Sequence, residues 1–174
     1  MAAIFAASTA ILLAALAFQY IGGYQPCILC YYQRVPYAVI LAGGFIYACA
    51  YLWSRCVLQG DGWDDKADLE ARRVITMLFI PAAIVFLIGA GLAAYHVGVE
   101  WKWWLGPDVC AMPGQSTPDD LNALFNQIMN TPIVHCDEVQ WSLFGISMAG
   151  YNVLMSLGLA AFSLIAFYRS RKNG

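Results

Sequence analysis

The stretch VITMLFIPAAIVFLIGAGLAAY, residues 74–95, decides the fold because it contains no Asp, Glu, Lys or Arg. A hydrocarbon core about 30 Å thick takes roughly 20 helical residues to cross, and this stretch is long enough. Three more uncharged apolar stretches cover Ile4–Ile21, Val35–Trp53 and Ile146–Tyr168. Each can pair its backbone groups within a helix, as lipid requires. The sequence therefore predicts an all-α membrane protein, a four-helix transmembrane bundle forming a single integral membrane domain over residues 1–174.

The composition agrees with a membrane location. Of the 174 residues, 61% are hydrophobic and 11% are charged, whereas a soluble domain carries about 25% charged residues. Nine Lys and Arg residues stand against eleven Asp and Glu residues, so no continuous basic surface is available for nucleic acid. These numbers exclude a water-soluble globule and a nucleic-acid-binding protein.

The first apolar stretch has a second interpretation as a signal peptide, because Ala15-Leu16-Ala17 has the small residues of a cleavage site. A signal peptide normally has basic residues before its apolar run. None precedes this run, and the run continues to Ile21. We therefore expect a membrane span here.

The distribution of basic residues predicts the orientation, because cytoplasmic connections of membrane proteins are enriched in Lys and Arg. Only Arg34 and Lys102 lie on the side of segments 22–34 and 96–145. We expect both termini in the cytoplasm and these two segments in the periplasm of a bacterium, outside its inner membrane. The other side carries Arg55, Lys66, Arg72, Arg73, Arg169, Arg171 and Lys172.

The predicted orientation divides the six cysteines into two groups. Cys49 lies in the second span and Cys56 lies just beyond its cytoplasmic end. We interpret Cys49 as a small apolar core residue and Cys56 as a reduced cytoplasmic thiol. The remaining four are expected on the oxidising side: Cys27, Cys30, Cys110 and Cys136.

Cys27-Ile28-Leu29-Cys30 is a C-x-x-C motif at the start of a membrane helix, directly after Pro26. Proline suits the first turn of a helix, and free amides at a helix start favour a thiolate. The motif alone is also compatible with half of a zinc site or with a structural disulfide. For zinc, His96 and His135 fit no common ligand spacing.

Two polar residues are expected near this motif. Arg34 follows Cys30 by four residues, so on a helix it could stabilise a thiolate or hold the oxygen of an electron-accepting ring. Alternatively, Arg34 reaches lipid phosphate. Pro36 would interrupt a helix that runs from Pro26, and this would kink the geometry from Cys30 to Arg34. His96 ends the third span at the same level, where it could donate to a bound ring or serve as an interfacial histidine.

The long outer loop contains the other two outer cysteines. Cys110 lies among Pro and Gly residues that oppose regular structure. Residues Thr117–Asn130 carry a capping pattern and an apolar face at helical spacing, which predicts a short amphipathic helix. This helix either packs against protein or lies on the outer leaflet.

Two outward thiol pairs in one chain suggest an electron relay, because thiolates pass electrons between disulfides through mixed disulfides. A soluble thiol protein could reach the loop pair. The sequence has no flavin, nicotinamide or haem motif, so the expected acceptor is dissolved in the bilayer, and a quinone (ubiquinone or menaquinone) fits.

The chain resembles the bacterial disulfide bond formation protein B (DsbB) family of quinone-reducing membrane oxidoreductases. The resemblance rests on three features: the stretch PCILCYYQR, residues 26–34; the two-cysteine outer loop; and the stretch CDEVQW, residues 136–141, which leads through Phe144-Gly145 into the last span. It covers nearly the whole chain. Gln33 stands where relatives can have an acidic residue.

The resemblance implies a role for each outer cysteine. Cys110 would form a mixed disulfide with a periplasmic thioredoxin-fold oxidase of the DsbA type, and Cys136 would be its resolving partner. Cys27 would exchange with this loop pair. Cys30 would be the thiolate that contacts the quinone, with Arg34 stabilising it and His96 nearby.

Two alternatives remain open from the sequence. A vitamin-K-epoxide-reductase-like quinone reductase also has a C-x-x-C motif and a loop cysteine pair, but there the C-x-x-C motif usually follows the loop pair. A non-catalytic metal-binding membrane protein would hold its outer thiols permanently on zinc.

Overall fold

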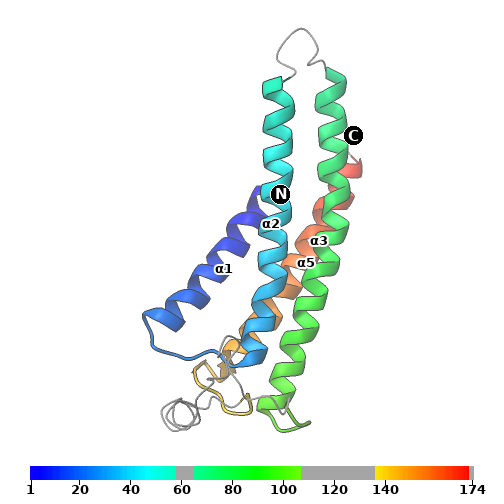
Figure 1. Ribbon diagram of the computed structural model, residues 1–174. Coiled ribbons are helices and arrows are strands. Elements are labelled where there is room, and N and C mark those ends of the chain that lie inside the picture. Colours follow the sequence, from blue (N-terminus) through cyan, green and yellow to red (C-terminus); the bar gives the residue numbers. More distant parts are fainter. Residues whose placement is uncertain (58–64, 107–135, 173–174) are drawn as a thin grey trace, which may run out of the picture.

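Four long helices make up most of the residues that the computed structural model describes, which are 1–57, 65–106 and 136–172 (Figure 1). They are α1 (Ala2–Tyr20), α2 (Ile28–Val57), α3 (Asp65–Glu100) and α5 (Met148–Lys172). All four are long and apolar enough to cross a membrane. The predicted all-α membrane bundle is confirmed for this part of the chain.

The helices extend beyond the predicted spans because a helix does not stop where the hydrocarbon ends. α2 begins at Ile28 rather than Val35, and α3 covers 36 residues, which corresponds to about 54 Å at 1.5 Å per residue. Figure 1 shows the two helices side by side, continuing past the start of α1. The early start of α2 places Cys30 in its first turn.

Two glycines allow the helices to approach closely. A Cβ atom at Gly44 of α2 would collide with the ring of Phe5 in α1, and one at Gly89 of α3 would lie 3.2 Å from Cγ of Pro36. α2 is not interrupted at Pro36, contrary to the expected break, and the proline ring packs where Gly89 has no side chain.

The core lies where α3 and α5 pack along each other and against α1 and α2. Tyr37 and Phe86 are almost fully buried there, with ring centroids 6.0 Å apart. Many large apolar side chains face outward, as expected for a surface in contact with lipid. Examples of these exposed side chains are Leu13, Phe45, Leu52, Met77, Ile88 and Leu154.

A short hairpin precedes α5. Strand β1 (Ser142–Leu143) pairs antiparallel with β2 (Ile146–Ser147) through a turn at Phe144 and Gly145. Both turn residues have positive φ, 52° and 78°, as the tight turns of two-residue hairpins require. The hairpin delays the start of α5 to Met148, two residues after the predicted start of the span.

Two predictions fall outside the described residues. These are the position of Cys110 and the amphipathic helix expected over Thr117–Asn130.

Candidate functional site

The C-x-x-C motif forms the start of α2. Cys27 precedes the first helical residue, and its carbonyl accepts a hydrogen bond from the Tyr31 amide at 3.3 Å. The Cys30 amide donates to Cys27 Sγ at 3.4 Å, and the Cys27 thiol donates to Cys30 Sγ at 3.2 Å. A disulfide is about 2.05 Å long, so both residues are free thiols placed for disulfide formation.

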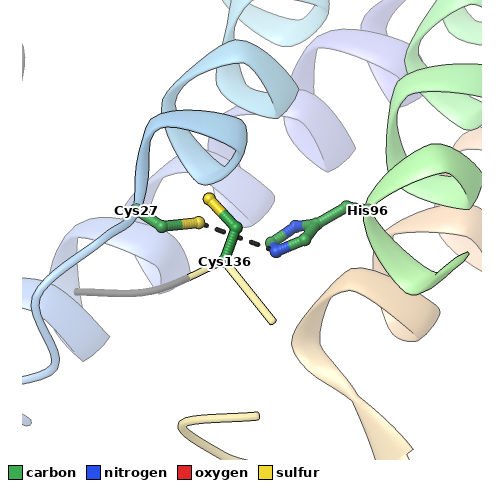
Figure 2. A group of neighbouring side chains, drawn as sticks. All are labelled: Cys27, His96 and Cys136. Carbon is green, nitrogen blue, oxygen red and sulfur yellow. Dashed lines mark hydrogen bonds between the residues drawn. The ribbon is translucent and has the colours of Figure 1, made fainter. Parts of the chain in front are cut away.

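Cys136, far away in the sequence, is buried beside this motif. Its Sγ, the Sγ of Cys27 and a ring nitrogen of His96 all lie within 4.8 Å of one another. Figure 2 shows the three side chains converging from the residue just before α2, from α3 and from the segment before the hairpin. The structure therefore brings together one cysteine from each of the two predicted pairs.

The surroundings keep two of these thiols protonated. The hydrogen bond to Cys30, together with burial, raises the pKa of Cys27 to about 12, although the His96 contact lowers it. Burial raises the pKa of Cys136 to about 11, against the effect of hydrogen bonds with the backbone of Leu29 and Ile28. Both groups are neutral at pH 7, and deprotonation requires assistance.

His96 contacts Cys27 directly, and it borders the same cavity as Cys30 and Arg34. Its Nε2 is 3.6 Å from Cys27 Sγ, and the amide nitrogen of Gln33 is 2.6 Å from its Nδ1. The ring is almost completely buried. Its position beside a thiol suits a proton donor or acceptor for sulfur exchange.

A buried chain of polar side chains continues from His96 into the bundle. Asn152 Nδ2 donates to Gln33 Oε1 at 2.7 Å, and the Tyr37 hydroxyl donates to Asn152 Oδ1 at 2.5 Å. The same hydroxyl lies 2.7 Å from Ser156 Oγ. The chain connects α3, α2 and α5, and it fixes the orientation of the imidazole.

Glu100 is a buried carboxylate that the sequence analysis missed. Its Oε1 is 4.0 Å from His96 Nε2, and its Oε2 accepts a hydrogen bond of 2.5 Å from Ser147 in β2. The sequence does contain one indication of this site, which is the presence of polar residues four positions apart. Such residues share a helix face, because they lie one turn apart. Three such pairs occur at this end of three helices: Gln33 and Tyr37, His96 and Glu100, and Asn152 and Ser156.

Arg34 points toward α1. Its Nη1 donates to Gln19 Oε1 at 2.7 Å, its Nη2 donates to the Ala15 carbonyl at 3.4 Å, and its guanidinium lies 5.2 Å from the centroid of the Tyr31 ring. These contacts fix the guanidinium beside the interior of the bundle.

A cavity of about 360 Å³ opens between α1, α2, α3, α5 and the hairpin. This volume is in the range of small-molecule sites. Its wall is mostly apolar, with Phe18 and Trp141 among the lining residues, and Cys30, Arg34 and His96 also border it. The cavity thus joins a thiol, a cation and an imidazole on one apolar surface.

Cys49 and Cys56 take no part in this cluster. Both are exposed on α2, so the expectation that Cys49 packs in the core is wrong. The lipid-facing surface of a membrane helix accepts a small apolar side chain as readily as the core does.

Comparisons with known proteins agree with these features. The family model described as "Disulfide bond formation protein DsbB" matches residues 1–166. A Methylococcus capsulatus protein named "Disulfide bond formation protein B" is 27% identical over 94% of this chain and 89% of its own length. Proteins of the same name from Xylella fastidiosa (strain Temecula1) and Dechloromonas aromatica are 24% and 27% identical, over 87% and 83% of this chain and 78% and 76% of their own lengths. No solved structure matches. The chain belongs to the DsbB family, and it is a disulfide-forming membrane oxidoreductase.

Proposed function

We propose that this chain re-oxidises a periplasmic thioredoxin-fold dithiol oxidase of the DsbA type and passes the electrons through two cysteine pairs to a membrane quinone, ubiquinone or menaquinone. It would do so in a bacterial inner membrane, with both termini cytoplasmic and Cys27, Cys30, Cys110 and Cys136 periplasmic. The family supports disulfide formation, and the geometry of the cluster supports the route.

The central observation is that Cys27 lies beside both Cys30, its partner in the C-x-x-C motif, and Cys136, a member of the loop pair. Its Sγ lies 3.2 Å from Cys30 Sγ and within 4.8 Å of Cys136 Sγ. Disulfides exchange when a thiolate attacks one sulfur and releases the other. Cys27 can therefore change partners between Cys30 and Cys136 with small side-chain movements.

The exchange begins at the loop pair. Cys110 takes the mixed disulfide with the first thiol of the partner and releases the Cys136 thiolate. The second thiol of the partner then completes the partner's own disulfide and releases Cys110. The loop pair is left as a dithiol, and the partner leaves oxidised.

The second exchange transfers the same two electrons to the C-x-x-C motif. The Cys136 thiolate attacks Cys27 of the Cys27–Cys30 disulfide, and Cys30 leaves as a thiolate. Attack of Cys110 on Cys136 then restores the loop disulfide and releases Cys27. His96 Nε2, 3.6 Å from Cys27 Sγ, is positioned to exchange a proton with this sulfur.

The cavity beside Cys30 suits a flat, largely apolar acceptor. A quinone supplies a sink for two electrons and two protons. The Cys30 thiolate would be the electron donor, and Arg34 would stabilise this thiolate and hold a ring oxygen, with His96 on the same wall. Gln19 and the Ala15 carbonyl fix the guanidinium for this task.

The experiment is the oxidation of a reduced DsbA-type protein by the purified chain with added ubiquinone, followed through loss of quinone absorbance. Stoichiometric quinol formation is expected. Arg34→Ala should slow quinone reduction by about tenfold or more, because one charge-assisted contact is lost, while the mixed disulfide of the partner with Cys110 still forms.

Arg169→Ala is the matched control, because Arg169 is an exposed basic residue in the last turn of α5. It should leave the rate unchanged. Quinone reduction that is equally fast in Arg34→Ala would leave Arg34 as a lipid anchor only, and no quinol formation in the native chain would refute the proposed acceptor.

A further inference from the structure

The three atoms at the centre of the exchange site also form a set of metal ligands. Cys27 Sγ, Cys136 Sγ and a ring nitrogen of His96 lie within 4.8 Å of one another, and all three residues are buried. They come from three separate parts of the chain (Figure 2). Thiolate and imidazole together are the donors that Zn²⁺ prefers.

The spacing suits zinc. With Zn–S near 2.3 Å and Zn–N near 2.05 Å, tetrahedral coordination separates sulfur and nitrogen by about 3.6 Å. The Cys27 Sγ to His96 Nε2 distance is 3.6 Å. An ion could therefore bind both atoms without a change in their separation.

Cys30 is the nearest fourth donor, because its Sγ lies 3.2 Å from Cys27 Sγ. Zinc-bound sulfurs are separated by about 3.8 Å, and Cys30 is not among the three donors that lie within 4.8 Å of one another, so its side chain would rotate away from Cys27 Sγ and toward the ion. A C-x-x-C motif with one further cysteine and one histidine gives a Cys₃His set, which is common in closed zinc sites.

The polar chain behind His96 provides the support that a metal-binding histidine needs. Such a histidine donates its second ring N–H to an oxygen, which orients the ring. Gln33 is 2.6 Å from Nδ1, and its amide can present either oxygen or nitrogen, because the two atoms are assigned from the hydrogen-bond network.

If the amides of Gln33 and Asn152 are both reversed, every hydrogen bond of this series of side chains can still form. The Gln33 nitrogen then donates to Asn152, Asn152 donates to the Tyr37 hydroxyl, and this hydroxyl donates to Ser156 Oγ, 2.7 Å away. Nδ1 of His96 then carries the proton, and the lone pair of Nε2 faces the two sulfurs.

We propose that the fully reduced chain binds one zinc ion through Cys27, Cys136, His96 and Cys30, and that this ion blocks sulfur exchange. Binding releases the proton of each coordinated thiol and transfers no electrons. The regulatory part rests on the proposed function, because the bound sulfurs are those that would change disulfide partners. Oxidation of either cysteine pair destroys the site, so zinc binds the reduced form only.

The test uses the full chain in detergent, reduced without oxygen and freed of reductant and quinone. Zinc binding is measured by competition with a chromogenic chelator, and Co²⁺ serves as a spectroscopic probe of thiolate coordination. We expect one ion per reduced chain, thiolate-to-cobalt charge-transfer absorption, and no comparable binding after oxidation.

Variants of single residues test whether zinc binds at this site or at other cysteines of the chain. Cys136→Ser and His96→Asn should each weaken zinc binding by more than about tenfold, and Gln33→Ala by about ten- to a hundredfold. The double variant Cys49→Ser, Cys56→Ser is the control and should bind as the native chain does. Circular dichroism verifies that each variant retains its helices.

Cys110→Ser tests whether the loop cysteine takes part, and it should keep its zinc affinity. Loss of binding in Cys110→Ser, or unchanged binding in both Cys136→Ser and His96→Asn, would overturn the proposed ligand set. An absence of thiolate absorption with Co²⁺ would overturn the site itself.

The metal-free reduced chain is assayed in parallel for quinone reduction, which keeps the two proposals separate. Quinone reduction without zinc binding refutes only the zinc site. Zinc binding without quinone reduction refutes the proposed electron acceptor and retains the ligand set. Added zinc should inhibit partner oxidation in the native chain, and the effect should reverse with a chelator.

Discussion

The five cysteines in the described part of the chain lie in two contrasting environments. Cys27, Cys30 and Cys136 gather at the start of α2, among helix amides, an imidazole and each other. Cys49 and Cys56 lie farther along the same helix and are exposed. A membrane helix can thus carry thiols at several levels, and the neighbouring groups determine which of these thiols can exchange.

The largest expected difference between the two environments is in turnover. Cys27→Ser should abolish oxidation of the partner by quinone, because no other sulfur described here lies beside both Cys30 and Cys136. Cys49→Ser, a change of the same size within α2, should remain within twofold of the native rate, since no chemistry is expected there. Both rates are measured as quinol formation. A Cys27→Ser variant with substantial turnover would show that electrons bypass Cys27.

The next difference is in reactivity toward alkylating reagents. In the reduced chain at pH 7, Cys27 and Cys136 are protonated because their pKa values are raised to about 12 and about 11. We expect them to react at least about a hundredfold more slowly than a free thiol of ordinary pKa, because the thiolate is the nucleophile.

Raising the pH should accelerate the alkylation of Cys27 and Cys136 up to pH 10 and beyond, since each pH unit below the pKa increases the thiolate fraction about tenfold. The sites are resolved by mass spectrometry after timed quenching. Cys56, which is exposed and lies beyond the membrane-spanning part of α2, serves as the internal reference. If Cys27 reacted at pH 7 as fast as Cys56, the protonated resting state would be excluded.

The smallest effect is expected from the supporting polar chain. Asn152→Ala removes the donor to Gln33 and the acceptor of Tyr37, which should cost about 1–2 kcal/mol of stability inside the membrane. Ser163→Ala is the matched control on α5, because its hydroxyl donates only to the Leu159 carbonyl one turn earlier.

The measurement for this pair is the thermal unfolding midpoint in detergent. Asn152→Ala should unfold at a lower temperature than Ser163→Ala. Equal midpoints would mean that the hydrogen-bonded side chains from His96 to Ser156 contribute no more to stability than a hydrogen bond within one helix.

The sequence predicts the parts of the molecule that depend on local pattern. Uncharged apolar stretches identify the four helices, and Pro26 followed by C-x-x-C places two thiols at a helix start. The exact helix ends differ because α3 begins in the polar stretch at Asp65, before the apolar span, and continues after it to Glu100. Backbone hydrogen bonding continues there after the apolar pattern has ended.

The parts that depend on packing between distant segments were harder to predict. Nothing in the spacing of Cys27, His96 and Cys136 shows that their side chains meet, because α3 and the segment before the hairpin first have to pack against α2. Arg34 also turns toward Gln19 of α1, an acceptor that no pattern around Arg34 indicates. The role of Glu100 was hidden for the same reason, because its partner Ser147 belongs to the hairpin, far from Glu100 in the sequence.

The protonated state of Cys27 and Cys136 has a consequence for the durability of the protein. Peroxides attack thiolates and convert them first to sulfenic and then irreversibly to sulfinic acid. Sulfurs that are buried and neutral at pH 7 present little thiolate to such reagents. These two sulfurs of the reduced chain are therefore protected from irreversible oxidation by small peroxides, and they stay available for exchange with a disulfide.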